Sequence, residues 1–137
     1  MSIPCVRFKD GVRLDPVTPT QVRLLTALDM CARMQGIDLT VTCGREGHPA
    51  GDVHTRGEAL DVRVIDLSSE KVLASYNYIR QVLGDLFTVL YEVPTTPTTT
   101  ALRQIAYINP QATAAHFHIQ PVKGTTYPPQ DTGRIVA

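Results

Sequence analysis

The chain has 137 residues, of which 43% are hydrophobic, and its thirteen basic residues balance its thirteen acidic ones. This length and composition predict a single globular domain with enough apolar material for a real core. The formal net charge is zero and no basic run occurs. A nucleic acid or an anionic membrane surface is therefore a poor partner, because both require many cationic contacts.

The three cysteines are odd in number and none lies in a C-x-x-C spacing, which argues against a disulfide framework or a cysteine-rich zinc site. Cys31 falls in a predicted helix and Cys43 at the end of a predicted strand, so we expect both to be buried free thiols. A nucleophilic Cys43 beside Arg45 and His48 is the alternative, although the sequence identifies no base for it.

The first regular element is a helix that follows an extended arm or short strand pair in residues 1–17. Thr18 is a suitable N-cap, Pro19 is favoured at the first helical position, and Gln21 completes a capping box. Apolar residues then recur at helical spacing up to Gly36, a residue that commonly ends helices. The pattern predicts a helix of about five turns.

Strands and a second helix follow in the middle of the chain. Residues 37–42 alternate apolar and polar side chains, as a half-buried strand does. Residues 43–55 are rich in Gly, Pro, Arg and His, which is typical of a loop. Strand character returns over residues 59–65, a serine-capped helix is predicted over residues 68–84, and residues 87–93 predict a strongly apolar strand.

The last third of the chain is less regular. Residues 94–100, Pro-Thr-Thr-Pro-Thr-Thr-Thr, predict an exposed loop. Residues 101–108 fit a helix and a strand equally, residues 116–122 fit a strand, and the tail 124–137 is expected to be irregular. This mixed order predicts one α+β domain, with a small, mostly antiparallel sheet and helices packed on it.

Two short segments carry residues that could converge on a metal ion. In the first, His54 and Asp61 flank a turn that contains Gly57, whose missing Cβ would let the chain fold back. Asp61 stands between apolar neighbours in a predicted strand, where a buried carboxylate needs a partner. Zinc would be a suitable partner, because it accepts nitrogen and oxygen ligands and uses three protein ligands in catalytic sites.

The second segment is His116-Phe117-His118. Side chains two residues apart on a strand share a face, so both histidines point away from the core if Phe117 and Ile119 point into it. One imidazole could then bind the metal while the other transfers a proton. The simpler alternative is two solvent-facing histidines, because four histidines are an ordinary number for a chain of this size.

The segment from His54 to Asp61, HTRGEALD, matches the HxxGxAxD signature of the LAS superfamily of zinc D-Ala-D-Ala peptidases. The superfamily includes carboxypeptidases, phage endolysins and dipeptidases, and the Hedgehog signalling domain shares its fold. His116-Phe117-His118 resembles the closing HxH of its carboxypeptidase and murein-endopeptidase branches. The likeness spans residues 42–120, roughly the predicted sheet.

The resemblance implies a role for each matched residue. His54, Asp61 and His118 would be the zinc ligands, and His116 would be the catalytic base or a partner of the transition state. Arg45, in a Thr-Cys-Gly-Arg context similar to the family's SGYR loop, would bind the substrate carboxylate or polarise its carbonyl.

Other positions are less clear or depart from the family pattern. His48 is expected to touch the substrate, with a plain surface histidine as the alternative, and Arg45 could likewise be a solvated loop arginine. Asp52 stands where the family usually has Ser, and Ala115 stands where many members have the glutamate of an ExxH pattern. Glu92 could replace that glutamate or be a structural carboxylate at a strand end.

Together these expectations describe a zinc metallopeptidase that acts on D-amino-acid-containing bonds of bacterial peptidoglycan, as a D,D-carboxypeptidase or an endopeptidase. Its partner would be a stem peptide, and its zinc site would lie on the open face of the sheet. The alternative is a non-catalytic zinc-binding structural or binding module of the same fold, for example in a phage particle. With no signal peptide or transmembrane stretch, we expect synthesis in the cytoplasm and delivery to the wall by phage lysis or another export route.

Overall fold

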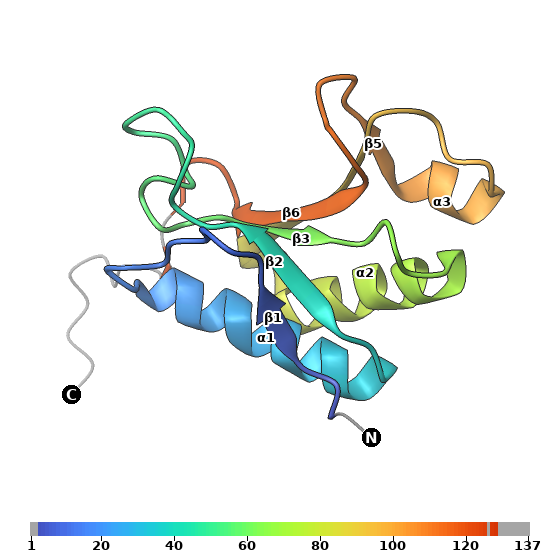
Figure 1. Ribbon diagram of the computed structural model, residues 1–137, viewed down its shortest axis with the longest axis horizontal. Coiled ribbons are helices and arrows are strands. Elements are labelled where there is room, and N and C mark those ends of the chain that lie inside the picture. The colour runs from blue at the N-terminus through green and yellow to red at the C-terminus, as the bar shows by residue number, and fades with distance from the viewer. Residues whose placement is uncertain (1–2, 126, 129–137) are drawn as a thin grey trace.

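Six strands form one open sheet in the order β1-β2-β3-β6-β4-β5 (Figure 1). The structure is a computed structural model that describes residues 3–125, 127 and 128. The strands are β1 (Val6–Phe8), β2 (Leu39–Cys43), β3 (Leu60–Arg63), β4 (Phe87–Val93), β5 (Ala106–Ile108) and β6 (His116–Pro121). The helices are α1 (Pro19–Gln35), α2 (Ser69–Leu83) and α3 (Thr100–Ile105), with a short 3-10 helix, η1 (Gly84–Leu86), before β4.

The middle of the sheet is antiparallel and its two edges are parallel. Strand β3 pairs with β2 and β6, and β6 pairs with β4, all in antiparallel fashion. The edge pairs β1–β2 and β4–β5 are parallel, because the chain crosses over through α1 and α3 between the paired strands. The predicted α+β fold with a mostly antiparallel sheet is confirmed.

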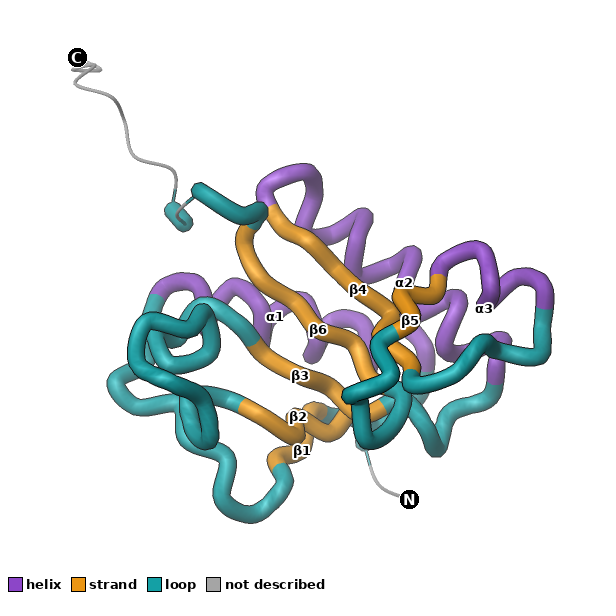
Figure 2. The backbone as a smooth tube through the Cα atoms, turned by 90° about the horizontal axis from the view of Figure 1, so that it is seen from above, coloured by secondary structure: helices purple, strands orange, loops and turns teal. Residues whose placement is uncertain are grey.

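Helices α1 and α2 lie side by side under one face of the sheet, and loops rise from the other face (Figures 1 and 2). Side chains along β3 and β6 alternate between the two faces. Val62, Phe117 and Ile119 are fully buried on the helix side, whereas Asp61 and His118 point to the open side. The metal-ligand candidates on the strands therefore lie on the face that the sequence predicts.

Both long helices begin and end at the predicted residues. The Thr18 side chain accepts from the Gln21 N–H and the Gln21 side chain accepts from the Thr18 N–H, and Gly36 ends α1 with a φ of 65°. Ser68 caps α2, and Gly84 follows its last turn. Among the residues described, no helix combines the length and apolar character needed to span a bilayer.

Three segments refine the predicted boundaries. Residues 101–108, which fit a helix and a strand equally, form both, because α3 ends where Ala106 takes an extended conformation and starts β5. The N-terminal arm supplies one strand, β1, which pairs with β2 rather than within the arm. Of the predicted irregular tail, residues 124, 125, 127 and 128 lie outside helices and strands, and 126 and 129–137 lie outside the described residues.

Candidate metal centre

Strand register places the carboxylate and one imidazole next to each other. Asp61 on β3 lies directly opposite His118 on β6, and His118 Nδ1 is 2.9 Å from Asp61 Oδ1. Two residues further along the same face, His116 lies opposite Arg63 on β3 and Glu92 on β4. The open face therefore carries two adjacent rows, Asp61–His118 and Arg63–His116–Glu92.

His54 comes from the loop between β2 and β3 and is only 3% exposed. Its Nδ1 lies 3.0 Å from the Gly44 carbonyl oxygen, and its Nε2 lies 3.4 Å from Asp61 Oδ2. The Asp52 carboxylate accepts a hydrogen bond from the His54 backbone N–H at 2.9 Å. Asp52, one of the departures from the family pattern, therefore helps to hold His54 in place.

The turn that joins His54 to Asp61 depends on Gly57. Its φ is +72°, and a Cβ at this position would lie 2.5 Å from Arg45 Nη2 and 2.8 Å from Thr18 Cγ2. The Thr18 hydroxyl donates to the Gly57 carbonyl, so the N-cap of α1 also holds this turn. The prediction that a glycine lets the chain fold back here is confirmed.

Hydrogen bonds determine which nitrogen of each imidazole is free. A carbonyl oxygen can only accept, so the contact with Gly44 requires the His54 proton on Nδ1. The side-chain amide nitrogen of Gln120 donates to the Pro121 carbonyl oxygen, so the Gln120 Oε1 atom faces His118 at 2.6 Å from Nε2. Because Oε1 can only accept, this contact requires a proton on His118 Nε2. Neutral imidazoles in these tautomers would direct lone pairs at the Asp61 carboxylate, an arrangement that repels unless a proton or a metal ion lies between each ring and the carboxylate.

This set of donor atoms could hold a metal ion. The ligand atoms of His54, Asp61 and His118 all lie within 4.8 Å of one another. Ligand atoms of a tetrahedral zinc site with bonds of about 2.0–2.1 Å are about 3.3 Å apart. Asp61 Oδ2 lies 3.4 Å from His54 Nε2, and Asp61 Oδ1 lies 2.9 Å from His118 Nδ1, so both distances are close to that value. The outer nitrogens of both rings donate to oxygen atoms, as those of metal-bound histidines do, and the three residues could hold a metal ion.

The same contacts shift two pKa values in opposite directions. Burial opposes ionisation of Asp61, but hydrogen bonds from His118 and His54 outweigh it and hold the Asp61 pKa well below its usual range. Burial likewise disfavours the imidazolium of His118, yet its bonds to Asp61 and Gln120 and the charge of Glu92 raise the pKa of His118. The Asp61 carboxylate therefore attracts a cation, whether a proton or a metal ion.

His116 lies beside the ligand group without belonging to it. Its Nδ1 is 2.9 Å from the Ala114 carbonyl oxygen, so this nitrogen carries a proton and Nε2 is the free one. His116 Nε2 lies 3.6 Å from Glu92 Oε2 and 4.0 Å from Asp61 Oδ1. Asn109 orients Glu92 by donating to the same Oε2 at 2.8 Å. His116 can therefore accept a proton at Nε2, and two carboxylates would stabilise the resulting imidazolium.

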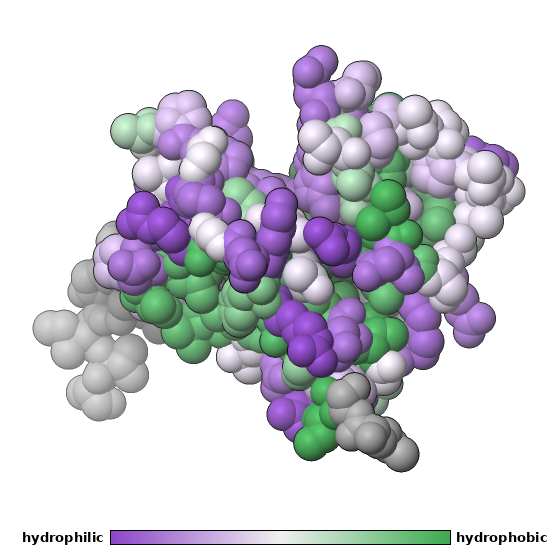
Figure 3. Space-filling model, in the orientation of Figure 1, coloured by the Kyte–Doolittle hydropathy of each residue, from purple (hydrophilic) through white to green (hydrophobic). Residues whose placement is uncertain are grey.

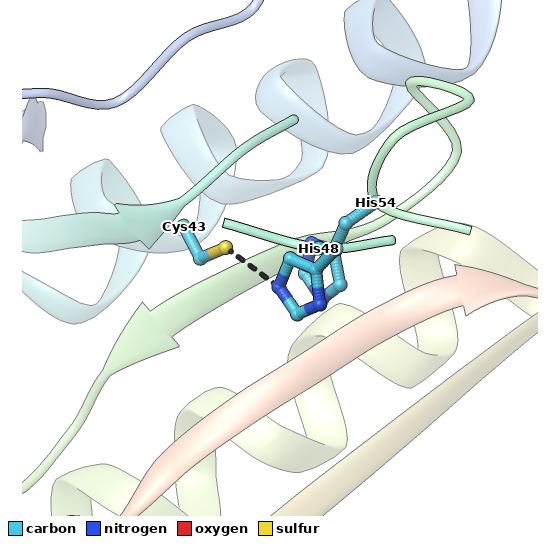
Figure 4. A group of neighbouring side chains, drawn as sticks. All are labelled: Cys43, His48 and His54. Carbon is cyan, nitrogen blue, oxygen red and sulfur yellow. Dashed lines mark hydrogen bonds between the residues drawn. The ribbon is translucent and has the colours of Figure 1, made fainter. Parts of the chain in front are cut away.

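A second group, Cys43, His48 and His54, could also hold a metal ion, because its ligand atoms lie within 4.8 Å of one another (Figure 4). His48 Nε2 is 3.2 Å from Cys43 Sγ, and the His48 ring stacks on His54 with centroids 4.3 Å and planes 10° apart. Stacked rings direct their in-plane lone pairs almost in parallel, so a metal here would require a side chain to rotate. Burial and the nearby charges of Asp61 and Glu46 raise the pKa of Cys43 to about 12, which opposes a nucleophilic thiolate.

Arg45 faces the main chain rather than the ligand group. Its guanidinium donates to the carbonyl oxygens of Leu14, Pro16 and Thr55 and lies against Gly57. This position differs from the expected arginine that points at a substrate, because Nε and both Nη atoms already have partners. Arg45 instead ties the N-terminal arm to the loop that carries His54.

A hollow opens beside the ligand group on the same face. It has a volume of about 270 Å³, and Asp61 and His116 line it together with Lys9, Cys43 and Arg63. Figure 3 shows the polar cleft into which this face opens, between one lobe formed by the β2–β3 loop and another formed by the segments around α3 and β5. A ligand could therefore reach Asp61 and His116 from solvent, whereas His48 is not among the residues that line the hollow and instead contacts Cys43.

No protein-family model, curated protein or solved structure matches the chain. A functional assignment therefore rests on the geometry of the ligand group and on the two histidine-containing segments of the sequence.

Proposed function

We propose that the protein is a zinc metallopeptidase that hydrolyses peptide bonds involving D-amino acids in the stem peptides of bacterial peptidoglycan. The observation that carries this proposal is the convergence of His54, Asp61 and His118 beside a solvent-accessible hollow that His116 also lines. Two nitrogen ligands and one oxygen ligand, with room for a reacting group, are one of the known patterns of a catalytic zinc site.

The protein's own part in the reaction is proton transfer. A zinc ion at the ligand group would supply Lewis-acid activation of the peptide carbonyl and the attacking water. His116 accepts the proton of the water at Nε2, because its Nδ1 is bound to Ala114, and then delivers it to the leaving nitrogen. The carboxylates of Glu92 and Asp61, 3.6 and 4.0 Å away, stabilise the imidazolium between these two transfers.

The pair His116–Glu92 favours a hydrolase over a non-catalytic zinc module. A structural zinc site needs only its ligands, whereas a free imidazole nitrogen next to an oriented carboxylate is what general acid–base catalysis requires. The substrate class comes from the sequence, because HTRGEALD and His116-Phe117-His118 resemble signatures of D-Ala-D-Ala peptidases. Side chains from both segments meet at one point of this fold, which supports a common site.

Digestion of purified muropeptides tests the proposal. Zinc-loaded protein should release new fragments that mass spectrometry detects, and chelator-treated protein should release none. The His116→Ala variant retains all three ligands, so it should keep its zinc and lose most of the turnover. If zinc-loaded protein leaves the muropeptides intact, the peptidase proposal fails and a non-catalytic zinc-binding module becomes the better description.

A further inference from the structure

We infer that Lys9 and Arg63 form a subsite for a substrate carboxylate, so that the enzyme removes one C-terminal residue rather than cutting inside a chain. This inference rests on the proposed function and names the kind of peptide that the site accepts. It concerns the two cationic residues of the hollow, which the ligand group and the proton-transfer pair do not use.

Both cations are placed to meet a ligand in the hollow beside Asp61 and His116. Arg63 is two residues beyond Asp61 on β3, which puts it on the same face about 7 Å further along the strand. Lys9 follows β1, and its backbone N–H donates to the Val41 carbonyl at 2.9 Å. Both residues are exposed, and within the part of the chain that the structure describes neither makes an ion pair.

Strand register sets the distance between proton transfer and carboxylate binding. Arg63 lies directly opposite His116, and the Cβ atoms of such a pair are about 5 Å apart. The amine nitrogen and the carboxylate carbon of one amino acid are separated by two bonds and are about 2.5 Å apart. A leaving residue whose nitrogen takes a proton from His116 can therefore present its own carboxylate to Arg63.

An internal peptide bond would not use this arrangement. The leaving segment would then carry a neutral amide where a terminal residue carries its carboxylate, and the two cations would meet no opposite charge. Arg45 is bound to three carbonyl oxygens, which leaves Arg63 as the arginine in the hollow. The planar guanidinium of an arginine can bind a carboxylate through two parallel hydrogen bonds.

The carboxylate of Asp61 makes binding at this subsite dependent on metal. Asp61 lines the same hollow and Glu92 lies 3.6 Å from His116, so these two carboxylates balance the charges of Lys9 and Arg63 and would repel a third carboxylate. A divalent ion held by His54, Asp61 and His118 would offset that charge and leave the net potential of the hollow positive. We therefore expect the subsite to bind carboxylates in the zinc-loaded protein and poorly after chelation.

Two matched peptides test the subsite in the zinc-loaded protein, an N-acetylated D-alanyl-D-alanine and the same peptide with a C-terminal amide. The acid should be cleaved with a kcat/KM at least about tenfold above that of the amide. Arg63→Gln should lower kcat/KM for the acid by about ten- to a hundredfold, mostly through KM, and leave the amide unchanged. Lys9→Gln should show the same selectivity with a smaller effect, and Arg63→Lys should restore part of the loss. Arg33→Gln, a change of an exposed arginine on α1, is the control and should alter neither substrate.

A binding measurement separates failure of this inference from failure of the proposed function. D-alanine and D-alaninamide contain no peptide bond between residues, so calorimetry on zinc-loaded protein reports binding without peptidase turnover. The acid should bind at least tenfold more tightly than the amide, and Arg63→Gln should abolish the difference. If acid and amide bind and react equally, the inference is overturned even when chelator-sensitive cleavage is observed. If the acid binds selectively but no peptide is cleaved, the subsite stands and the peptidase proposal fails.

Discussion

His118 lies directly opposite Asp61 in the β3–β6 ladder, with Nδ1 2.9 Å from the Asp61 carboxylate and Nε2 2.6 Å from Gln120 Oε1. Gln120 is two residues beyond His118 on the same strand and therefore shares its face. A single strand thus supplies both the imidazole and the group that fixes its orientation. This relationship determines which nitrogen of His118 is available to a metal ion.

Removing the Gln120 acceptor should weaken zinc binding. In Gln120→Leu the His118 Nε2–H loses its partner, so zinc affinity should fall by about ten- to a hundredfold, the usual effect of losing an outer hydrogen bond at a metal site. Competition with a chelating dye measures the affinity. Gln111→Leu, in an exposed loop, is the control. An unchanged affinity in Gln120→Leu would mean that His118 does not bind zinc through Nδ1.

The two candidate ligand groups should respond differently to substitution. Asp61→Asn and His118→Ala should each reduce bound zinc from about one ion per chain to nearly none, because one of three ligands is lost. Cys43→Ser and His48→Gln should retain their zinc. Elemental analysis after dialysis gives the stoichiometry. If Cys43→Ser loses its zinc and His118→Ala retains it, the metal binds to the group of Cys43, His48 and His54 instead.

The stability of the metal-free protein should be greater near pH 5 than near pH 8. The lowered pKa of Asp61 adds stability that is present above the unfolded value of about 4 and is lost as the pH falls through the folded value. The raised pKa of His118 adds stability that is fully present below the unfolded value of about 6.5 and is lost as the pH rises through the folded value. Both contributions are therefore present between about pH 4 and pH 6.5.

Zinc should reverse this dependence, because protons compete with the metal for Asp61 and the imidazoles. Urea unfolding at several pH values, with chelator and with zinc, measures both trends. In the metal-free protein, His118→Asn should remove the loss of stability that occurs as the pH rises through the folded pKa of His118. The same pH trend in the two conditions would show that the carboxylate–imidazole group does not control stability.

Loss of the proton-transfer residues should lower turnover without loss of metal. His116→Ala should retain zinc while kcat falls by about two to four orders of magnitude, as expected for removal of a general base. Glu92→Gln keeps the shape of the side chain and its contact with Asn109 but removes the charge, so kcat should fall less, by about tenfold. Steady-state kinetics with the zinc content measured in parallel checks both. Full activity in His116→Ala would leave His116 without a catalytic role.

Gly57→Ala should destabilise the fold and loosen the zinc site together. The new Cβ would collide with Arg45 and Thr18 at a φ of +72°, so the free energy of unfolding should fall by about 1–3 kcal/mol. Zinc affinity should also fall, because His54 is carried by the same turn. Gly11→Ala is a matched control, since Gly11 also has a positive φ but has open space around it. Equal effects of the two substitutions would mean that Gly57 has no special link to the site.

Much of the fold was predictable because its signals are local. The capping box at Thr18, the glycine at the end of α1, and the alternation of Phe117 and Ile119 with two histidines each depend on residues close in sequence. These patterns were enough to place both strand-borne ligand candidates on the open face. The glycine between the first ligand pair also indicated the turn correctly.

The rest depends on contacts between distant segments. Nothing near Glu92 in the sequence indicates that β4 lies beside β6 and brings its carboxylate to His116. The role of Arg45 depends on three carbonyl oxygens, two of them in the N-terminal arm, and loop composition gives no sign of them. The contact of Cys43 with His48 likewise depends on the path of the loop.

X-ray absorption spectroscopy of the zinc-loaded protein tests the central claim most directly. The proposed centre predicts only nitrogen and oxygen ligands at about 2.0–2.1 Å, with scattering from two imidazoles, and an unchanged spectrum in Cys43→Ser. A sulfur ligand at about 2.3 Å that disappears in Cys43→Ser would place the ion between Cys43 and His48. That result would contradict a catalytic zinc site built from His54, Asp61 and His118.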